Sequence, residues 1–222
     1  MESQSTQALK NIINVQPFSD LSEEGKNLLH ENMEYKYYSI GERIYRNDEL
    51  PFNVNFIIKG EARILVQSTG ENSLITIERR GPGTFIGWVS LLRGKSCETV
   101  QVSKDIEAIS LSSEVFVRLC LTEKRFADYF NKKSDASETW DVLSTYFDKY
   151  PYKSEDLDLI IRDACKTSQI LEHEELKNCE EKELILSTAN CNLPIGQLVD
   201  DIKEIKNKQG FVFETRVIKL DA

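Results

Sequence analysis

The sequence predicts an α+β protein built on an antiparallel β-roll, or jelly roll, with flanking helices and a small C-terminal α+β unit. Three observations predict this fold. Short runs of β-type residues follow one another between residues 35 and 111 at intervals of about 8 to 12 residues, as in antiparallel sheets. Seven of the ten glycines fall in this interval, where tight turns are needed. Helical patterns precede and follow it.

We expect three parts along the chain of 222 residues. Residues 1–17 form a flexible N-terminus, residues 18–150 the β-roll with its helices, and residues 151–222 a small α+β accessory or linker unit. The second boundary is placed at Pro151, because proline cannot continue a helix and biases the preceding residue away from helical angles.

Composition and charge narrow the class of function. The net charge of −9 argues against an extended nucleic-acid surface or a polybasic membrane patch. Five widely spaced cysteines without a CxxC pair, and only two histidines, favour reduced thiols and no metal site. The start lacks a secretory signal, and no apolar run is long enough to span a membrane. We therefore expect a cytoplasmic location without direct membrane insertion.

The first clear element is a helix that begins after Ser22. This serine is an N-cap, two glutamates follow it in the first turn, and apolar side chains recur on one face as far as Met33. His30 lies on this helix, and we expect it to be a surface residue. A further turn of helix is expected at about residues 9–15.

Eight strands are expected in the roll. They are YKYY (35–38), ERIY (42–45), VNFIIK (54–59), EARILVQ (61–67), SLITIERR (73–80), TFIG (84–87), TVQVS (99–103) and IEAISL (106–111). We expect Gly60 to reverse the chain between the third and the fourth of these as a hairpin turn.

After residue 111 the pattern becomes helical. Ser112 and Ser113 can cap a first helix, a short second helix carries Phe126 and Phe130, and a third spans residues 136–150. We expect the aromatic side chains of these helices to pack on the roll. In the C-terminal unit, Ser154 is expected to cap a helix, and the β runs ELILSTA and GFVFETRVIKL flank a loop at residues 190–196.

The stretch from Gly81 to Val102 has the character of a phosphate cradle. Its strand leads into Gly87, a single turn of apolar helix follows, and β-type residues resume at Thr99. A glycine followed at once by a helix N-terminus aims unpaired backbone N–H groups at one point, which suits phosphate.

This stretch resembles the phosphate-binding cassette of cyclic-nucleotide-binding domains, whose pattern runs Gly-x-x-Phe-Gly-Glu-(apolar)-(small)-Leu-Leu, then a loop, then Arg-(Ser/Thr)-Ala-x-Val. The residues that match are Gly83, Gly87, Ser90, Leu91, Leu92 and Val100, with Ile86 in the place of Phe. Residues 41–42 and 56–62 are similar to further patterns of the family. The resemblance implies a β-roll whose following helices close the ligand pocket.

Two ionic residues of the cassette are replaced. Trp88 stands where the family has the Glu that holds the ribose hydroxyl, and Ser96 where it has the Arg that pairs with the cyclic phosphate. Each lost charge-assisted hydrogen bond is worth about 1.5–3 kcal/mol, so affinity falls by about two to four decades. Glu98 further disfavours an anionic ligand. We therefore expect impaired or lost binding of cyclic AMP, and no other cofactor.

The expected ligand site is this degenerate cassette. Its residues are Ile86, Gly87, Trp88, Val89, Ser90, Arg93, Lys95, Ser96 and Cys97. Arg93 and Lys95 would supply positive charge or act as solvated loop residues, and Trp88 would stack on a purine or fill the pocket.

The stretch IGWVSLLRG, with CE a few residues on, is also similar to the N-terminal cytoplasmic region of peptidase-containing bacterial ABC exporters. That resemblance implies a non-catalytic regulatory domain for toxin or peptide export. Its partners would be peptidase and transporter domains of the same polypeptide or of another protein. The alternative is a receptor for a different nucleotide or metabolite, with Trp88, Arg93 and Ser96 contacting it.

Two other classes of function are disfavoured. A catabolite-activator-type transcription regulator needs a basic recognition helix, but residues 151–222 hold 15 acidic against 10 basic side chains, with Asp200, Asp201 and Glu204 at the relevant place. An enzyme is disfavoured because no Walker motif, Gly-x-Gly-x-x-Gly sequence or peptidase-like Cys-His pair is present.

Overall fold

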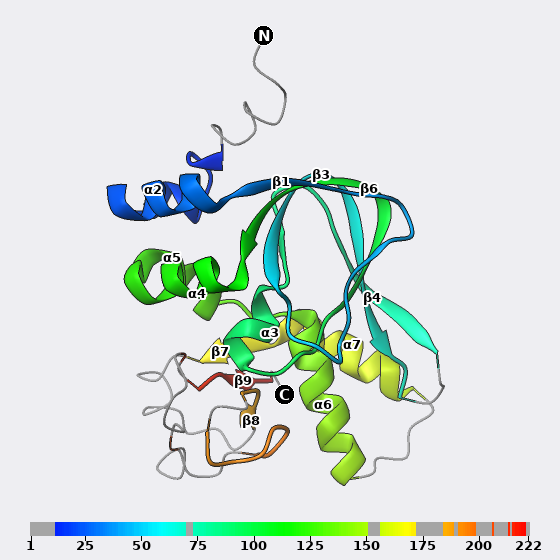
Figure 1. Cartoon of the computed structure of the whole chain (residues 1–222). Helices are drawn as coiled ribbons and strands as arrows, with labels where there is room; N and C mark the ends of the chain where they lie inside the picture. The colour runs from blue at the N-terminus through cyan, green and yellow to red at the C-terminus, as the bar shows by residue number, and fades with distance from the viewer. Residues whose placement is uncertain are drawn as a thin grey trace.

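The computed structural model describes residues 12–69, 73–150, 156–171, 184–188, 191–198, 206, 213 and 215–220. Figure 1 shows a twisted β-roll with helices α2, α4 and α5 packed at one end, and with α6, α7 and a second small sheet on the side of α3. The helices are α2 (Glu23–Asn32), α3 (Trp88–Arg93), α4 (Ser113–Thr122), α5 (Lys124–Asn131), α6 (Ala136–Lys149) and α7 (Leu157–Thr167), after a 3-10 turn at Phe18–Asp20. No described helix is both long and apolar enough to cross a bilayer.

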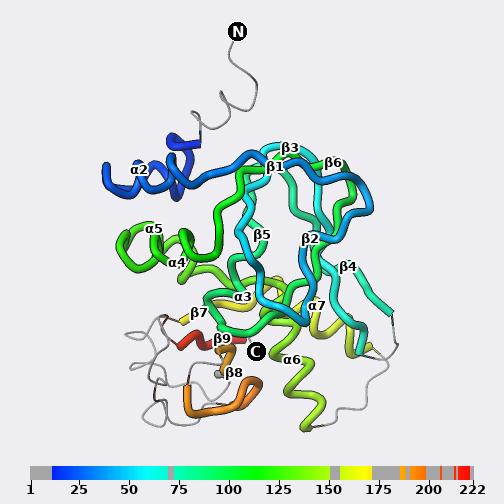
Figure 2. The backbone as a smooth tube through the Cα atoms, viewed as in Figure 1, coloured from blue at the N-terminus to red at the C-terminus, as the bar shows by residue number. Residues whose placement is uncertain are grey.

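The roll is a six-stranded antiparallel sheet, which confirms the predicted fold class. Its strands are β1 (Glu34–Tyr38), β2 (Arg43–Tyr45), β3 (Asn53–Gln67), β4 (Leu74–Arg80), β5 (Phe85–Ile86) and β6 (Thr99–Ser112). The order β1-β6-β3-β4 forms the main path, β2 pairs with β6, and β5 pairs with β3. The curved backbone of this roll is clearest in Figure 2.

The predicted hairpin at Gly60 is wrong. β3 continues through Gly60 as one strand, and its pairing with β6 shifts register between Ile57 and Ala62. Gly60 has φ +92°, and a Cβ there would lie 2.0 Å from the carbonyl oxygen of Asp105. The glycine therefore allows a bulge where two long strands press together, and β6 likewise joins two runs that we expected to be separate.

The helices begin where the sequence predicts N-caps. Ser22 accepts a hydrogen bond from the backbone of Gly25 at 3.1 Å, and Ser112 accepts one from Val115 at 3.3 Å. The Ser22 side chain also donates to Glu123 at 2.5 Å, which fixes α2 against the junction of α4 and α5. The expected cap at Ser154 lies outside the described residues, and so do residues 9–11 of the helical turn expected at about residues 9–15. In its described part, the backbone N–H of Val15 donates to the carbonyl oxygen of Ile12 at 2.9 Å.

The largest part of the core is aromatic. Phe130 lies at the centre of this cluster, with ring centroids of Phe85, Phe116 and Phe126 between 5.0 and 5.2 Å away. Phe126 and Phe130 are buried, which confirms that the helices after the roll pack their aromatic faces onto it. A second cluster of aliphatic side chains fills the roll itself.

A second, three-stranded antiparallel sheet lies beside α6. It has the order β7 (Gln169–Leu171), β9 (Val217–Lys219), β8 (Leu184–Leu186). β8 and β9 fall within the two predicted β runs, whereas β7 was not predicted. Figures 1 and 2 place this sheet close to α3 and α6, where Ile170 and Ile218 join a core cluster with Trp140. Residues 172–183 and most of residues 199–214 lie outside the described residues.

Candidate functional site

The predicted phosphate cradle has the expected backbone. Gly87 has φ +87° and directly precedes α3, so it provides the left-handed turn from β5 into the helix. A Cβ on Gly87 would lie 2.7 Å from the Tyr45 ring and 2.8 Å from the carbonyl oxygen of Asn53. Tyr45 therefore covers the turn on its strand side, and only glycine fits beneath it.

The cradle is occupied by a side chain of the chain itself. The backbone N–H of Gly87 donates to Oε2 of Glu98 at 2.8 Å, and the Glu98 side chain is fully buried. Its other oxygen, Oε1, has no hydrogen-bond partner among the described residues and lies 4.0 Å from Nη1 of Arg80. Burial and the charge of Asp135 raise the pKa of Glu98 to about 8 against the opposing effect of Arg80. Below that pH the carboxyl is protonated, so the cradle needs no compensating cation.

Arg80 links β4 to the start of α6 beneath the cradle. Its Nη2 donates to Asp135 at 2.7 Å and to Glu78 at 2.7 Å, and its Nη1 donates to the carbonyl oxygen of Phe85 at 3.2 Å. Asp135 caps α6 and also accepts from the backbone of Ser137 at 3.0 Å. Burial opposes ionisation of Asp135, but Arg80 and Ser137 hold the pKa of this carboxyl below its ordinary value.

The first predicted ligand residues lie in the core. Ile86 and Val89 are fully buried, and Ser90 accepts a hydrogen bond from the backbone of Cys97 at 3.2 Å. Trp88 is only 5% exposed and packs against Phe130 with centroids 5.4 Å apart. The indole thus fills space between α3 and α5.

The remaining predicted residues, Arg93, Lys95, Ser96 and Cys97, make contacts within the protein. Arg93 is fully buried, donates to Asp141 at 2.7 Å and donates from Nε to the carbonyl oxygen of Ser187 at 2.8 Å. Lys95 donates to the same Asp141 at 2.8 Å. Ser96 donates to the carbonyl oxygen of Arg46 at 3.1 Å, and burial raises the pKa of Cys97 to about 12.

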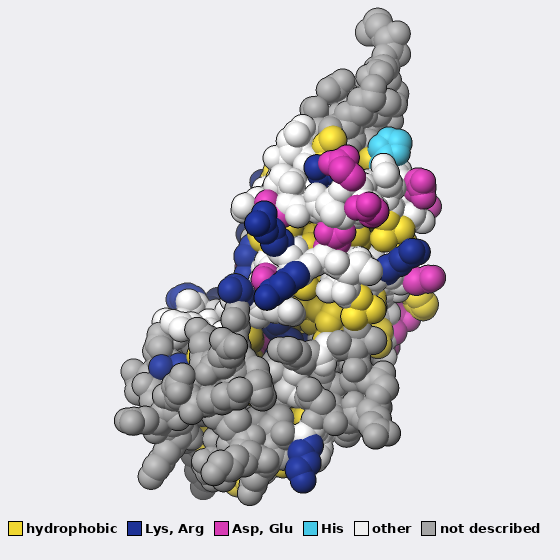
Figure 3. Space-filling view, turned by 90° about the vertical axis from the view of Figure 1, so that its left-hand side faces the viewer, with side chains coloured by type: hydrophobic (Ala, Val, Ile, Leu, Met, Phe, Trp, Pro, Cys, Tyr) yellow, Lys and Arg dark blue, Asp and Glu magenta, His cyan; other side chains and the backbone are white. Residues whose placement is uncertain are grey.

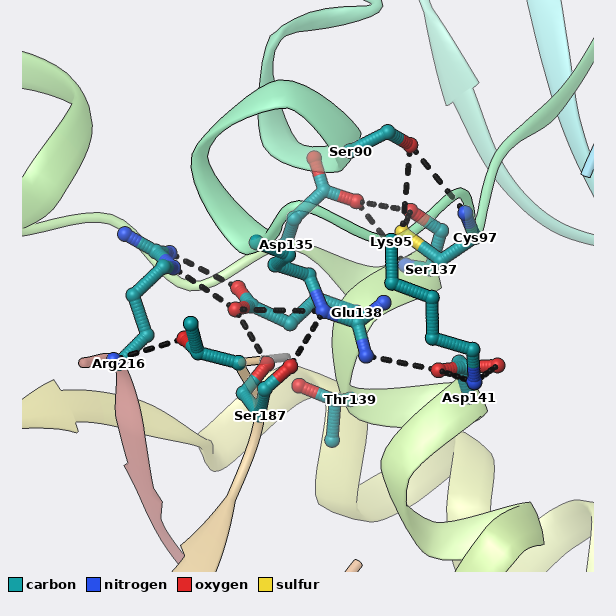
Figure 4. A network of polar contacts seen from close by, with 12 residues as sticks. Ser90, Lys95, Cys97, Asp135, Ser137, Glu138, Thr139, Asp141, Ser187 and Arg216 are labelled. Carbon is teal, nitrogen blue, oxygen red and sulfur yellow. Dashed lines mark hydrogen bonds and ion pairs between the residues drawn. The ribbon is translucent and has the colours of Figure 1, made fainter. Parts of the chain in front are cut away.

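A second buried ion pair joins α6 to the C-terminal sheet. Glu138 accepts hydrogen bonds from Arg216 at 2.8 Å and from the hydroxyl of Ser187 at 2.6 Å. The guanidinium of Arg216 lies 5.7 Å from the centroid of Trp88, on the side of the cradle helix. Figure 4 shows Asp135, Glu138 and Asp141 along α6, with partners from α3 and from the C-terminal segment.

Comparison with known proteins identifies the roll. Residues 35–123 match the family model of the cyclic nucleotide-binding domain. This part of the chain is similar to cyclic nucleotide-binding domains. No curated protein sequence matches the chain.

Solved structures of cyclic nucleotide-binding proteins are similar to this chain at low sequence identity. A mutant regulatory subunit of a cAMP-independent protein kinase A from Trypanosoma brucei, bound to cAMP, has 15% identity and a TM-score of 0.50 over 57% of this chain and 45% of its own. The regulatory domain of Toxoplasma gondii PKA with cAMP has 13% identity and a TM-score of 0.48, covering 98% of this chain and 86% of its own. The catabolite activator protein of Thermus thermophilus has 20% identity and a TM-score of 0.44, covering 64% and 62%. The chain thus spans less than half the length of the Trypanosoma brucei subunit.

Several buried charged residues around the cradle were not predicted from the sequence. Arg80, Asp135, Glu138 and Arg216 form buried ion pairs, yet we did not predict any of them as site residues. One local signal existed, because Asp135 and Glu138 stand three apart at a helix start, as in a capping box. Nothing local indicates that their partners lie on β4 and next to β9.

Next to the cradle lies a cavity of about 610 Å³. Its aromatic lining comes from Phe85, Trp88, Tyr129 and Phe130, and its charged lining from Glu78, Arg80, Lys133, Asp135, Arg162 and Lys166. It is bounded by β4, β5, α5, the start of α6, and α7. This volume is in the range of small-molecule sites.

Proposed function

We propose that this chain is a non-catalytic regulatory domain of cyclic-nucleotide-binding type whose cradle does not hold cyclic AMP. The observation that carries the proposal is the 2.8 Å hydrogen bond from Gly87 to the buried carboxyl of Glu98. A phosphate entering there would have to displace Glu98, and Ser96 stands where the family has the pairing arginine. Arg80, 4.0 Å from Glu98, already donates to Asp135 and Glu78. Displacement would leave a buried polar group without its partner, which is costly.

The same site supports a role in passing a signal between parts of the chain. Arg93, at the end of the cradle helix, contacts both Asp141 on α6 and Ser187 beside β8. A movement of α3 would therefore shift α6 and the C-terminal sheet through these hydrogen bonds. These contacts support a docking module whose output is the position of α6 and the sheet.

Binding of cyclic AMP and cyclic GMP, followed by isothermal titration calorimetry, tests the proposal. We expect no saturable heat with the unaltered protein. Combining Trp88→Glu, Ser96→Arg and Glu98→Ala empties the cradle and restores the two ionic residues of the cassette, so we expect saturable binding. Glu114→Ala, on the exposed face of α4, is the matched control. Micromolar binding of cyclic AMP by the unaltered protein would refute the proposal.

The exporter partner belongs to the proposal as well. Its support is the resemblance of the IGWVSLLRG stretch to the cytoplasmic region of peptidase-containing exporters. Cytoplasmic peptidase or transporter domains would then receive the signal from this domain. The coding sequence of the full-length protein checks this: a cysteine peptidase motif followed by apolar spans of about 20 residues supports it. A full-length protein without either would refute it.

Nucleic acid is not among the partners that we propose. On the face shown in Figure 3, Lys and Arg side chains lie among Asp and Glu side chains and exposed hydrophobic ones. Such mixed charge does not form a continuous basic field along which a phosphate backbone could bind. The net charge of −9 supports the same view.

A further inference from the structure

The cavity beside the cradle is lined by cations that form no ion pair with its own carboxylates. Both of its carboxylates, Glu78 and Asp135, accept hydrogen bonds from Arg80 and so are engaged with one guanidinium. Lys133 and Arg162 line the same cavity and form no ion pair within the described part of the chain. Lys166, at the rim, pairs with Asp163 at 2.7 Å in an exposed contact.

The guanidinium of Arg162 makes one weak hydrogen bond and leaves another donor group without an acceptor. Its Nη2 donates to the carbonyl oxygen of Thr76 at 3.3 Å, a long contact. Its Nε is buried and has no hydrogen-bond partner among the described residues. A buried guanidinium N–H without an acceptor is costly, so an acceptor in the cavity would be favourable.

The other wall of the cavity is aromatic. Trp88 and Phe130 pack at 5.4 Å, and Phe85 and Tyr129 line the cavity beside them. The ammonium of Lys133 lies 3.4 Å from the centroid of Tyr129, which keeps this cation at the aromatic wall. A flat ring placed against these side chains would therefore have two cations within the same cavity.

We propose that this cavity binds a planar aromatic ring bearing a phosphate monoester, with the phosphate held by Lys133 and Arg162. A phosphate monoester is a dianion at neutral pH and matches the two cations, Lys133 and Arg162, that line this cavity. A guanidinium also binds phosphate in a bidentate manner. The anion end of this ligand faces α5 and α7 and lies away from Gly87, where Glu98 already occupies the cradle. This inference goes beyond the proposed function and does not require the cradle to bind anything.

Calorimetry with 5′-AMP tests the assignment, with adenosine and inorganic phosphate as partial ligands. We expect saturable binding of 5′-AMP and at least tenfold weaker binding of each partial ligand. Arg162→Gln and Lys133→Gln should each weaken 5′-AMP binding by about 10- to 100-fold. Arg125→Gln and Lys124→Gln, on exposed residues of α5 that do not line the cavity, are the matched controls. These controls should bind as the unaltered protein does.

Tryptophan fluorescence locates the ligand independently of affinity. The chain has two tryptophans, and Trp140→Phe leaves Trp88, at the cavity wall, as the single one. We expect 5′-AMP to quench this fluorescence with the midpoint seen by calorimetry. Unchanged fluorescence at saturation would overturn the assignment.

Two further outcomes would overturn the inference: no saturable binding of 5′-AMP, or equal binding by the cavity variants and their controls. If Glu98→Gln alters 5′-AMP affinity while Arg162→Gln does not, the ligand lies in the cradle and the inference fails. Binding of cyclic AMP that is insensitive to Arg162→Gln would refute the proposed function instead. The inference would then still be judged on the 5′-AMP series.

Discussion

Arg216 donates two hydrogen bonds to the carboxylate of Glu138, from Nε to Oε1 and from Nη2 to Oε2, each at 2.8 Å. The two residues are 78 positions apart, and both are buried. Arg216 also donates to the carbonyl oxygens of Asn131 and Lys133. One side chain from the C-terminal segment therefore holds the end of α5, the start of α6 and, through its ring contact, Trp88.

Arg216→Ala should lower the free energy of unfolding by about 3–5 kcal/mol, because it leaves Glu138 buried without the cation that donates two hydrogen bonds to it. Urea unfolding followed by circular dichroism measures the change. Arg216→Lys keeps the charge but not the two parallel bonds, so we expect an intermediate loss. Arg118→Ala, at an exposed position on α4, should stay within about 0.5 kcal/mol. A loss below about 1 kcal/mol for Arg216→Ala would contradict the role assigned to this pair.

Glu98 predicts a specific pH dependence of stability. Burial raises its pKa from an ordinary 4.5 to about 8 in the folded chain, so the folded state binds this proton more tightly than the unfolded state does. Its contribution to stability is complete below about pH 4.5 and is lost as pH rises to about 8. Unfolding measured across this range should show a fall of a few kcal/mol that Glu98→Gln removes. Parallel curves for the two proteins would contradict this assignment.

Asp135 acts in the opposite direction and in a lower range of pH. The pKa of this carboxyl is held below its ordinary value of 3.8, so its contribution is present above that pH and is lost under more acidic conditions. Asp135→Asn should therefore flatten the stability curve below about pH 4, while leaving the range above pH 5 parallel to that of the unaltered protein. The same urea series checks both residues.

Gly60→Ala should destabilise the roll far more than Gly41→Ala. Both glycines have positive φ, +92° and +86°, so both alanines pay the cost of a left-handed backbone, about 1–2 kcal/mol. Only at Gly60 would the new Cβ also meet a backbone oxygen, at 2.0 Å, whereas nothing lies within 4 Å at Gly41. Thermal unfolding of the two variants measures the difference. Equal losses would mean that β3 and β6 can separate at the bulge.

Phe130→Ala should remove about 3–5 kcal/mol, because this ring lies among five others at the centre of the aromatic cluster. Phe130→Leu should cost less, since it keeps most of the volume. The matched control is Phe52→Ala, because Phe52 is 80% exposed and its truncation should be nearly neutral. A similar loss for Phe52→Ala would show that the exposed ring has a role that its contacts do not indicate.

The antiparallel roll and its capped helices could be predicted because each has a local signal. Alternating apolar residues, N-cap serines and clustered glycines each predict the secondary structure of the few residues next to them. The error at Gly60 has the same origin: a glycine between apolar runs is typical both of a turn and of a bulge, and only the position of Asp105 across the sheet decides between them. β7, a strand of three residues directly after a helix, is too short to show a period.

The backbone conformation of the cradle could be predicted, but the side-chain contacts within and beside it could not. The sequence indicated that Glu98 disfavours an anionic ligand, and the structure adds that this carboxyl bonds to Gly87 itself. Arg93 and Lys95 were expected near a ligand, and the structure gives them Asp141 as a shared partner, 48 and 46 residues away. Pairings at such separation depend on how helices pack, which a single sequence does not encode locally. A ligand-binding role for the cassette residues stays a prediction.

The contact of Arg93 with Ser187, together with that of Glu138 with Arg216, bears on how the protein can be shortened for experiments. A fragment that ends at the proline after α6 would leave the buried charges of Arg93 and Glu138 without partners that lie in the last forty residues. Exposing them to water would loosen the very helix that follows Gly87. Recombinant versions should therefore retain β9. Binding measured on a version without β9 would describe a cradle whose helix α3 has been loosened.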